Sequence, residues 1–106
     1  MTRIQSEDVF NEAISNMQTT VVKFDTTWCP DCKRLNTFIG DVTAKHADKV
    51  WYEVDAEEFS DLAQKYDVRG IPTLLVFRNG EKLAHLHSAH AKTKQQVEGF
   101  LSGIQA

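Results

Sequence analysis

Cys29 and Cys32 are the only cysteines in this chain of 106 residues, and they stand three positions apart. Two thiols at this spacing can close into a disulfide and reopen, and such a pair can exchange electrons with another disulfide. The same two residues could also bind a metal ion, or have no chemical role. The residues around the pair provide the means to choose between these interpretations.

The cysteines lie where a predicted strand, residues 20–26, gives way to a predicted helix, residues 30–46. Pro30 suits the first helical position and disfavours a helical conformation for Cys29. We therefore expect Cys29 at the cap of the helix, where unpaired backbone amides and the helix dipole stabilise its thiolate. A thiolate is the nucleophile in disulfide exchange, so Cys29 should attack a substrate and Cys32, one turn further on, should resolve the mixed disulfide.

Asp31 stands between the cysteines. Its charge opposes ionisation of Cys29 by under about 1 kcal/mol at roughly 6 Å in near-aqueous surroundings. The helix dipole favours ionisation by up to about 2 kcal/mol. We expect the dipole to prevail and Asp31 to reduce its effect on Cys29. A less stabilised thiolate favours the disulfide form, which makes the cysteine pair a better reductant. The alternative is that Asp31 only stabilises the first turn of the helix.

Composition predicts one domain, residues 1–106, with ordinary proportions of 42% hydrophobic and 25% charged residues. A net charge of −3, with no basic stretch longer than Lys33 and Arg34, argues against nucleic-acid and membrane partners. The N-terminus turns polar at once, and no apolar run approaches the roughly 20 residues that span a bilayer. We expect a cytoplasmic protein, in which a permanent structural disulfide is disfavoured.

Apolar periodicity predicts the elements that hold the cysteines. Strands are expected at 3–4, 20–26, 50–55, 73–77 and 82–87, and helices at 7–17, 30–46, 57–66 and 94–104. Strands separated by helices predict parallel pairing, while Asn79 and Gly80 predict a hairpin that adds an antiparallel edge strand. The expected fold is α/β, a three-layer α/β/α sandwich around a mixed sheet of four to five strands, with a bend at Gly40.

Three stretches of the sequence resemble the thioredoxin family. Residues 28–33 are similar to its active site, 66–74 to its second signature, and 77–81 to its edge hairpin. The resemblance covers essentially the whole chain. It implies the thioredoxin fold and reduction of protein disulfides, with a redox-active Cys29–Cys32 disulfide and no bound cofactor. It also implies that Pro72 is a cis-proline that faces the cysteines.

The resemblance also implies a substrate groove. Its lining would comprise Trp28, Pro30, Gly70, Ile71 and Pro72, and an extended segment of a disulfide-containing protein would pair with the backbone before the proline. A glycine usual in a nearby loop of the family is replaced by Ser88, which would narrow access. Trp28 could instead serve only in packing. The implied electron donor is a thioredoxin reductase, and the implied oligomeric state is a monomer.

One departure from the family concerns a buried aspartate on the strand before the active site, where this chain has Lys23. The lysine that usually partners this aspartate is also absent, since Trp51 takes its place. A buried lysine needs a partner or must be neutral. We expect Lys23 to pair with Asp25 or Glu53, and Asp25 or a neutral Lys23 to assist Cys32. Alternatively, Lys23 extends to solvent and has no role.

Two other classes of function stay open. A glutathione-linked reductase is one, because glutaredoxins also have proline after the first cysteine, although Trp28 and residues 71–73 argue against it. The other is a docking module without catalysis, or a metal-binding cysteine pair. His85, His87 and His90 could join the cysteines around zinc, but the spacing typical of zinc fingers is absent. We therefore expect solvated histidines and no metal.

Overall fold

A computed structural model describes residues 1–104, so the last two residues of the predicted domain lie outside the described part. Five strands form one sheet in the order β1-β3-β2-β4-β5. The strands are β1 Thr2–Arg3, β2 Thr20–Asp25, β3 Val50–Asp55, β4 Thr73–Arg78 and β5 Glu81–Leu86. The helices are α1 Glu7–Ile14, α2 Pro30–Asn36, α3 Ile39–Lys45, α4 Ser60–Lys65 and α5 Lys94–Ser102, with a short 3₁₀ helix η1 at Ser88–His90.

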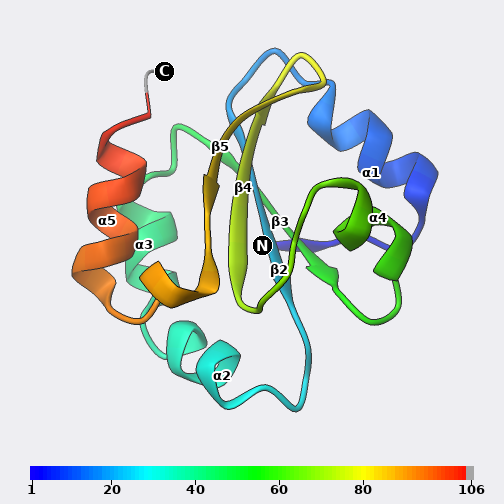
Figure 1. The fold of residues 1–106 in the computed structure, drawn as a ribbon. Coiled ribbons are helices and arrows are strands. Elements are labelled where there is room, and N and C mark those ends of the chain that lie inside the picture. Colours follow the sequence, from blue (N-terminus) through cyan, green and yellow to red (C-terminus); the bar gives the residue numbers. More distant parts are fainter. Residues whose placement is uncertain (105–106) are drawn as a thin grey trace.

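The helices lie on both faces of the sheet, as Figure 1 shows. Helices α1 and α4 cover one face, α3 and α5 cover the other, and α2 lies beyond the end of β2. The predicted three-layer sandwich and mixed sheet are confirmed. Between residues 1 and 104, no helix combines the length and the apolar character needed to cross a membrane.

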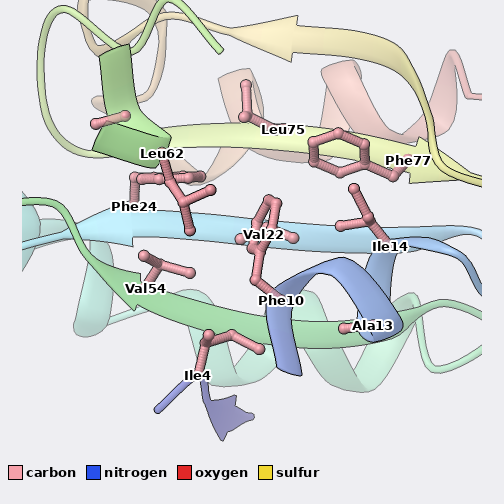
Figure 2. Packing of buried hydrophobic residues seen from close by; sticks show 11 residues of the cluster. Ile4, Phe10, Ala13, Ile14, Val22, Phe24, Val54, Leu62, Leu75 and Phe77 are labelled. Atoms are coloured by element: carbon pink, nitrogen blue, oxygen red, sulfur yellow. The ribbon is translucent and has the colours of Figure 1, made fainter. Parts of the chain in front are cut away.

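Strand β2 lies at the centre of the sheet and is buried on both faces. Figure 2 shows the packing on one of these faces. Val22 and Phe24 face α1 and α4, where they join Phe10 and other apolar side chains. Val21 faces the opposite way, into the cluster formed with α2, α3 and α5. Because side chains alternate along a strand, this burial fixes the register of β2. The loop with the cysteines therefore begins from a rigidly held strand.

Strand β4 runs antiparallel to β2, whereas the connecting helix predicted parallel pairing. The reason is the shortness of the connecting helix. Helix α4 has six residues and rises only about 9 Å, while a strand of six residues spans roughly 20 Å. The chain therefore re-enters the sheet at the end where β3 finished. This reversal brings residues 70–72, which precede β4, to the same end as the cysteines.

The predicted helix 30–46 is two helices, and the prediction of a bend at Gly40 is wrong, because α3 continues through that residue. The break lies at Thr37 and Phe38. The Thr37 hydroxyl donates to the Arg34 carbonyl oxygen at 2.7 Å. The amides of Thr37 and Phe38 bond three residues back rather than four, at 3.2 and 3.1 Å. A side-chain bond to the backbone and a tightened last turn end α2.

The predicted helix 57–66 is also shorter than expected. Helix α4 begins at Ser60, because the Asp55 carboxylate captures the preceding amides. Its Oδ1 atom accepts from the amides of Glu57 and Glu58 at 2.9 and 3.0 Å. Aspartate side chains stabilise turns in this way at the expense of helix. The turn places Glu57 near the loop that carries the cysteines.

Candidate active site

Cys29 is the N-cap of α2, with φ −77° and ψ 118°, and Pro30 is the first helical residue. The Cys29 sulfur accepts a hydrogen bond from the amide of Cys32, with an N···S distance of 3.1 Å. The predicted capping geometry is confirmed. A backbone amide and the positive end of the helix both act on this sulfur, so negative charge is stabilised there.

Cys32 lies deeper than its partner, with 1% of its surface exposed against 4% for Cys29. Burial, together with the hydrogen bond to the Cys29 sulfur, raises the pKa of Cys32 to about 12. The Asp25 charge acts in the same direction, while the Thr26 amide opposes it. The Cys32 proton therefore stays in place at neutral pH until a base removes it. The two cysteines are both reduced in this structure, and the environment makes them unequal.

The segment before β4 faces the cysteines. The Ile71–Pro72 peptide bond is cis, as predicted, and the Cys29 thiol lies 3.8 Å from the Ile71 carbonyl oxygen. Gly70 packs against the loop that begins at Ser88, since a Cβ atom at Gly70 would lie 2.4 Å from the Ser88 hydroxyl oxygen. Ser88 therefore stands next to the predicted groove.

Trp28 is 61% exposed, beside the buried cysteines. Its indole nitrogen donates to the Glu57 carboxylate, which fixes how the ring lies. Pro30 is also exposed. Packing alone does not account for a large aromatic ring that remains mostly in solvent. Sequence reasoning missed Glu57, whose turn is formed by Asp55 rather than by the predicted helix.

Lys23 is only 3% exposed and is fully engaged, so extension to solvent is excluded. Its ammonium nitrogen lies 2.8 Å from Asp25 Oδ2 and 3.4 Å from Glu53 Oε2. It also donates to the Asn36 side-chain oxygen at 2.6 Å. The predicted ion pair is confirmed with both carboxylates. Asn36 was missed, although its position four residues after Cys32 places it on the same face of the helix.

Asp31 binds Lys92, which lies just before α5. The distance from Lys92 Nζ to Asp31 Oδ2 is 2.5 Å, and Arg34 lies at 4.0 Å from the other carboxylate oxygen. The hydrogen bond from Lys92 lowers the pKa of Asp31 below its usual range. Sixty-one positions separate the partners, so no local pattern indicates the pair.

Two histidines of the last strand and its exit contact each other. His85 and His87 stack with ring centroids 4.0 Å apart, and Lys82 donates to His85 Nδ1 at 3.1 Å. The other His85 ring nitrogen is buried, so the expected solvation is wrong for this residue. Within residues 1–104, no three His, Cys, Asp or Glu side chains are grouped so as to hold a metal ion.

Comparison with known proteins connects this geometry with one family. The family model described as thioredoxin matches residues 1–102. Thioredoxin-1 of Saccharomyces cerevisiae is 34% identical over 98 residues, which cover 92% of this chain and 95% of that protein. The thioredoxin of Equus caballus is 30% identical over 104 residues, with 96% of each chain covered.

A solved thioredoxin structure has the same fold as this chain. The thioredoxin of Plasmodium falciparum superposes with a TM-score of 0.81 at 26% identity, covering 93% of this chain and 97% of that one. The resemblance of the three sequence stretches is thereby confirmed over the whole fold. This chain belongs to the thioredoxin family, whose members are protein-disulfide oxidoreductases.

Proposed function

We propose that this protein reduces disulfides of other proteins by a two-step thiol–disulfide exchange. The Cys29 thiolate attacks one sulfur of the substrate disulfide, and the other substrate sulfur leaves as a thiolate. Cys32 then loses its proton and attacks the Cys29 sulfur, which releases the second substrate thiolate and leaves a Cys29–Cys32 disulfide. Two electrons have passed to the substrate. The hydrogen bond from the Cys32 amide to the Cys29 sulfur, at 3.1 Å, carries this proposal.

The second step needs a base because the pKa of Cys32 is raised to about 12. We propose Asp25 for this role, since its charge acts on Cys32 and its carboxylate is buried nearby. Lys23 holds that carboxylate at 2.8 Å, and Glu53 shares the same ammonium group. Asp25 thus takes the Cys32 proton while Lys23 keeps the carboxylate in place.

The substrate would lie across the exposed edge of the site. Its extended backbone would pair beside Ile71, whose carbonyl lies 3.8 Å from the attacking sulfur, with Gly70 and Pro72 flanking it. Trp28 and Pro30 would contact the segment from the other side, where both are exposed. Main-chain pairing of this kind accepts many sequences, so the substrates would be diverse disulfide-containing proteins.

The cysteine pair is the redox group in this proposal, with no bound cofactor. A thioredoxin reductase would return the two electrons, and the protein would act as a monomer in the cytoplasm. The family of the chain and its ordinary composition support these roles.

The test is reduction of insulin disulfides coupled to a thioredoxin reductase and NADPH. The wild-type chain should turn over, and Cys29→Ser should abolish the activity. Cys32→Ser should instead trap a mixed disulfide at Cys29. An unreactive Cys29 would overturn the proposal and favour a docking module. Turnover only with glutathione and hydroxyethyl disulfide would favour the glutathione-linked alternative.

A further inference from the structure

Asp31 and Lys92 form an ion pair at the edge of the cysteine site, and each side chain is partly buried. Lys92 Nζ lies 2.5 Å from Asp31 Oδ2, well within range of a charge-assisted hydrogen bond. The second cation near this carboxylate, Arg34, lies at 4.0 Å and is mostly exposed. Lys92 is therefore the main partner of Asp31.

The backbone at Lys92 is held in place by the start of α5. The side-chain oxygen of Gln96 accepts from the amides of Lys92 and Thr93 at 2.8 and 3.1 Å. The Thr93 hydroxyl accepts in turn from the Gln96 amide at 3.1 Å, which completes a capping box. Helix α5 packs through Val97 against the core. The ammonium group thus extends from a fixed point, so the pair joins the start of α2 to the start of α5.

The ion pair bears on the chemistry because Asp31 lies in the first turn of α2, two residues after Cys29. An uncompensated carboxylate there opposes the helix dipole that stabilises the Cys29 thiolate. A cation in contact with the carboxylate cancels most of this opposition. We propose that Lys92 is a positioning residue that holds the Asp31 carboxylate and thereby sets how readily Cys29 ionises. This inference rests on the proposed function, since it concerns the same nucleophile.

The experiment measures the rate of Cys29 alkylation by iodoacetamide against pH in the reduced full-length chain. Lys92→Met removes the cation and leaves Asp31 uncompensated. The midpoint should rise by about 0.5 pH unit, a roughly threefold lower ratio of thiolate to thiol, as Coulomb's law gives for unit charges about 6 Å apart in water. In the Asp31→Asn background, Lys92→Met should shift the midpoint much less, because no carboxylate then holds the ammonium group beside the cysteine site.

Two further variants separate charge from structure. Lys92→Arg keeps a cation and should restore the wild-type midpoint. Lys94→Met removes a neighbouring lysine, which pairs with Asp41 at 3.3 Å rather than with Asp31. This variant should keep the wild-type midpoint of Cys29 alkylation.

If wild-type Cys29 reacts faster than Cys32, an unshifted midpoint in Lys92→Met would overturn this inference and leave the proposed function standing. A shift of equal size in the Asp31→Asn background would overturn it as well, because Lys92 would then act without Asp31. If wild-type Cys29 reacts no faster than Cys32, the proposed function fails and the inference fails with it.

Discussion

Cys29 and Cys32 are the same residue type three positions apart, yet the fold gives them different chemistry. Cys29 caps a helix and accepts an amide hydrogen bond, while Cys32 lies deeper, where burial raises the pKa of its thiol to about 12. One sulfur is thereby prepared to attack, and the other is held back until a base acts on it. The division of roles follows from position in a helical turn rather than from residue type.

Asp25→Asn should slow the second step of the exchange. The substitution keeps the shape of the side chain and removes the carboxylate that we assign as proton acceptor for Cys32. Loss of a general base typically costs about a hundredfold or more, so decay of a mixed disulfide at Cys29 should slow by about that factor. Rapid quenching and mass spectrometry of the mixed disulfide would measure the rate.

The matched control is Glu53→Gln, which removes the other carboxylate in contact with Lys23, at 3.4 Å. Decay of the mixed disulfide should stay close to the wild-type rate in this variant. Equal rates for Asp25→Asn and the wild type would show that another group receives the proton.

Lys23→Met should destabilise the chain strongly. It leaves the Asp25 carboxylate buried without the ammonium group that lies 2.8 Å away. Breaking a buried ion pair by removal of one partner costs about 3 kcal/mol or more, and urea denaturation should show a loss of that size in the free energy of unfolding. Replacing both partners, as in Lys23→Met with Asp25→Leu, should recover most of the loss.

The comparison for Lys23 is Arg3→Met. Arg3 makes more exposed pairs with Glu53 and Asp55, both at 3.4 Å. Exposed pairs contribute under about 1 kcal/mol, so this variant should unfold nearly as the wild type does. A similar loss in both variants would mean that burial of Lys23 has no special energetic role.

At the scale of elements, short connections decide where the site forms. Helix α4 is too short to carry the chain back along the sheet, so β4 enters antiparallel beside β2. The break between α2 and α3 ends the catalytic helix after Asn36, which bonds to Lys23. The start of α4 and the end of α2 follow from side-chain contacts of Asp55 and Thr37 to the backbone, which no apolar pattern encodes.

The hairpin between β4 and β5 offers a test of local conformation. Asn79 and Gly80 have φ of 54° and 81°, as the Asn-Gly turn predicts. Gly80→Ala places a Cβ atom in the left-handed region, which costs about 1 kcal/mol. Chemical denaturation should show that loss without a change in Cys29 reactivity.

The control, Gly40→Ala, should change the free energy of unfolding in the opposite direction. Gly40 lies inside α3, and a Cβ atom there would meet nothing within 4 Å. Alanine is favoured over glycine in a helix by about 1 kcal/mol, so this variant should be more stable. Destabilisation by Gly40→Ala, or none by Gly80→Ala, would contradict this account of the two glycines.

The stability of the whole molecule should depend on pH through His85. Burial lowers the pKa of His85, and the charges of His87 and Lys82 lower it further. The unfolded chain, with the ordinary value of about 6.5, therefore binds more protons than the folded one below that pH. The free energy of unfolding should therefore keep its full value above about pH 6.5 and decrease as the pH falls toward 5.

Thermal unfolding of His85→Gln should show a flatter dependence on pH between 7 and 5. His90→Gln changes an exposed residue of η1 and should keep the wild-type slope. A full slope in His85→Gln would assign the effect to another group. The carboxylates with lowered pKa, such as Asp67 beside Arg69, act at lower pH and do not disturb this window.

The sequence by itself determined the layers, the helix that begins at Pro30, the cap at Cys29 and the hairpin at Gly80. These depend on contacts within a few residues and on the periodicity of apolar side chains. The pairing of Lys23 with Asp25 was also predictable, because side chains two apart on a strand share a face. Only the tertiary structure decided the direction of β4.

The tertiary structure also decided which residue pairs with Asp31. Lys92 reaches it from 61 residues away because α5 packs beside α3 and shares an apolar cluster with α2, and such a contact has no local signature. The identity of the nucleophile is thus local in origin. The compensation of charge around it depends on the assembled fold, since opposite charges distant in sequence meet only after the layers pack.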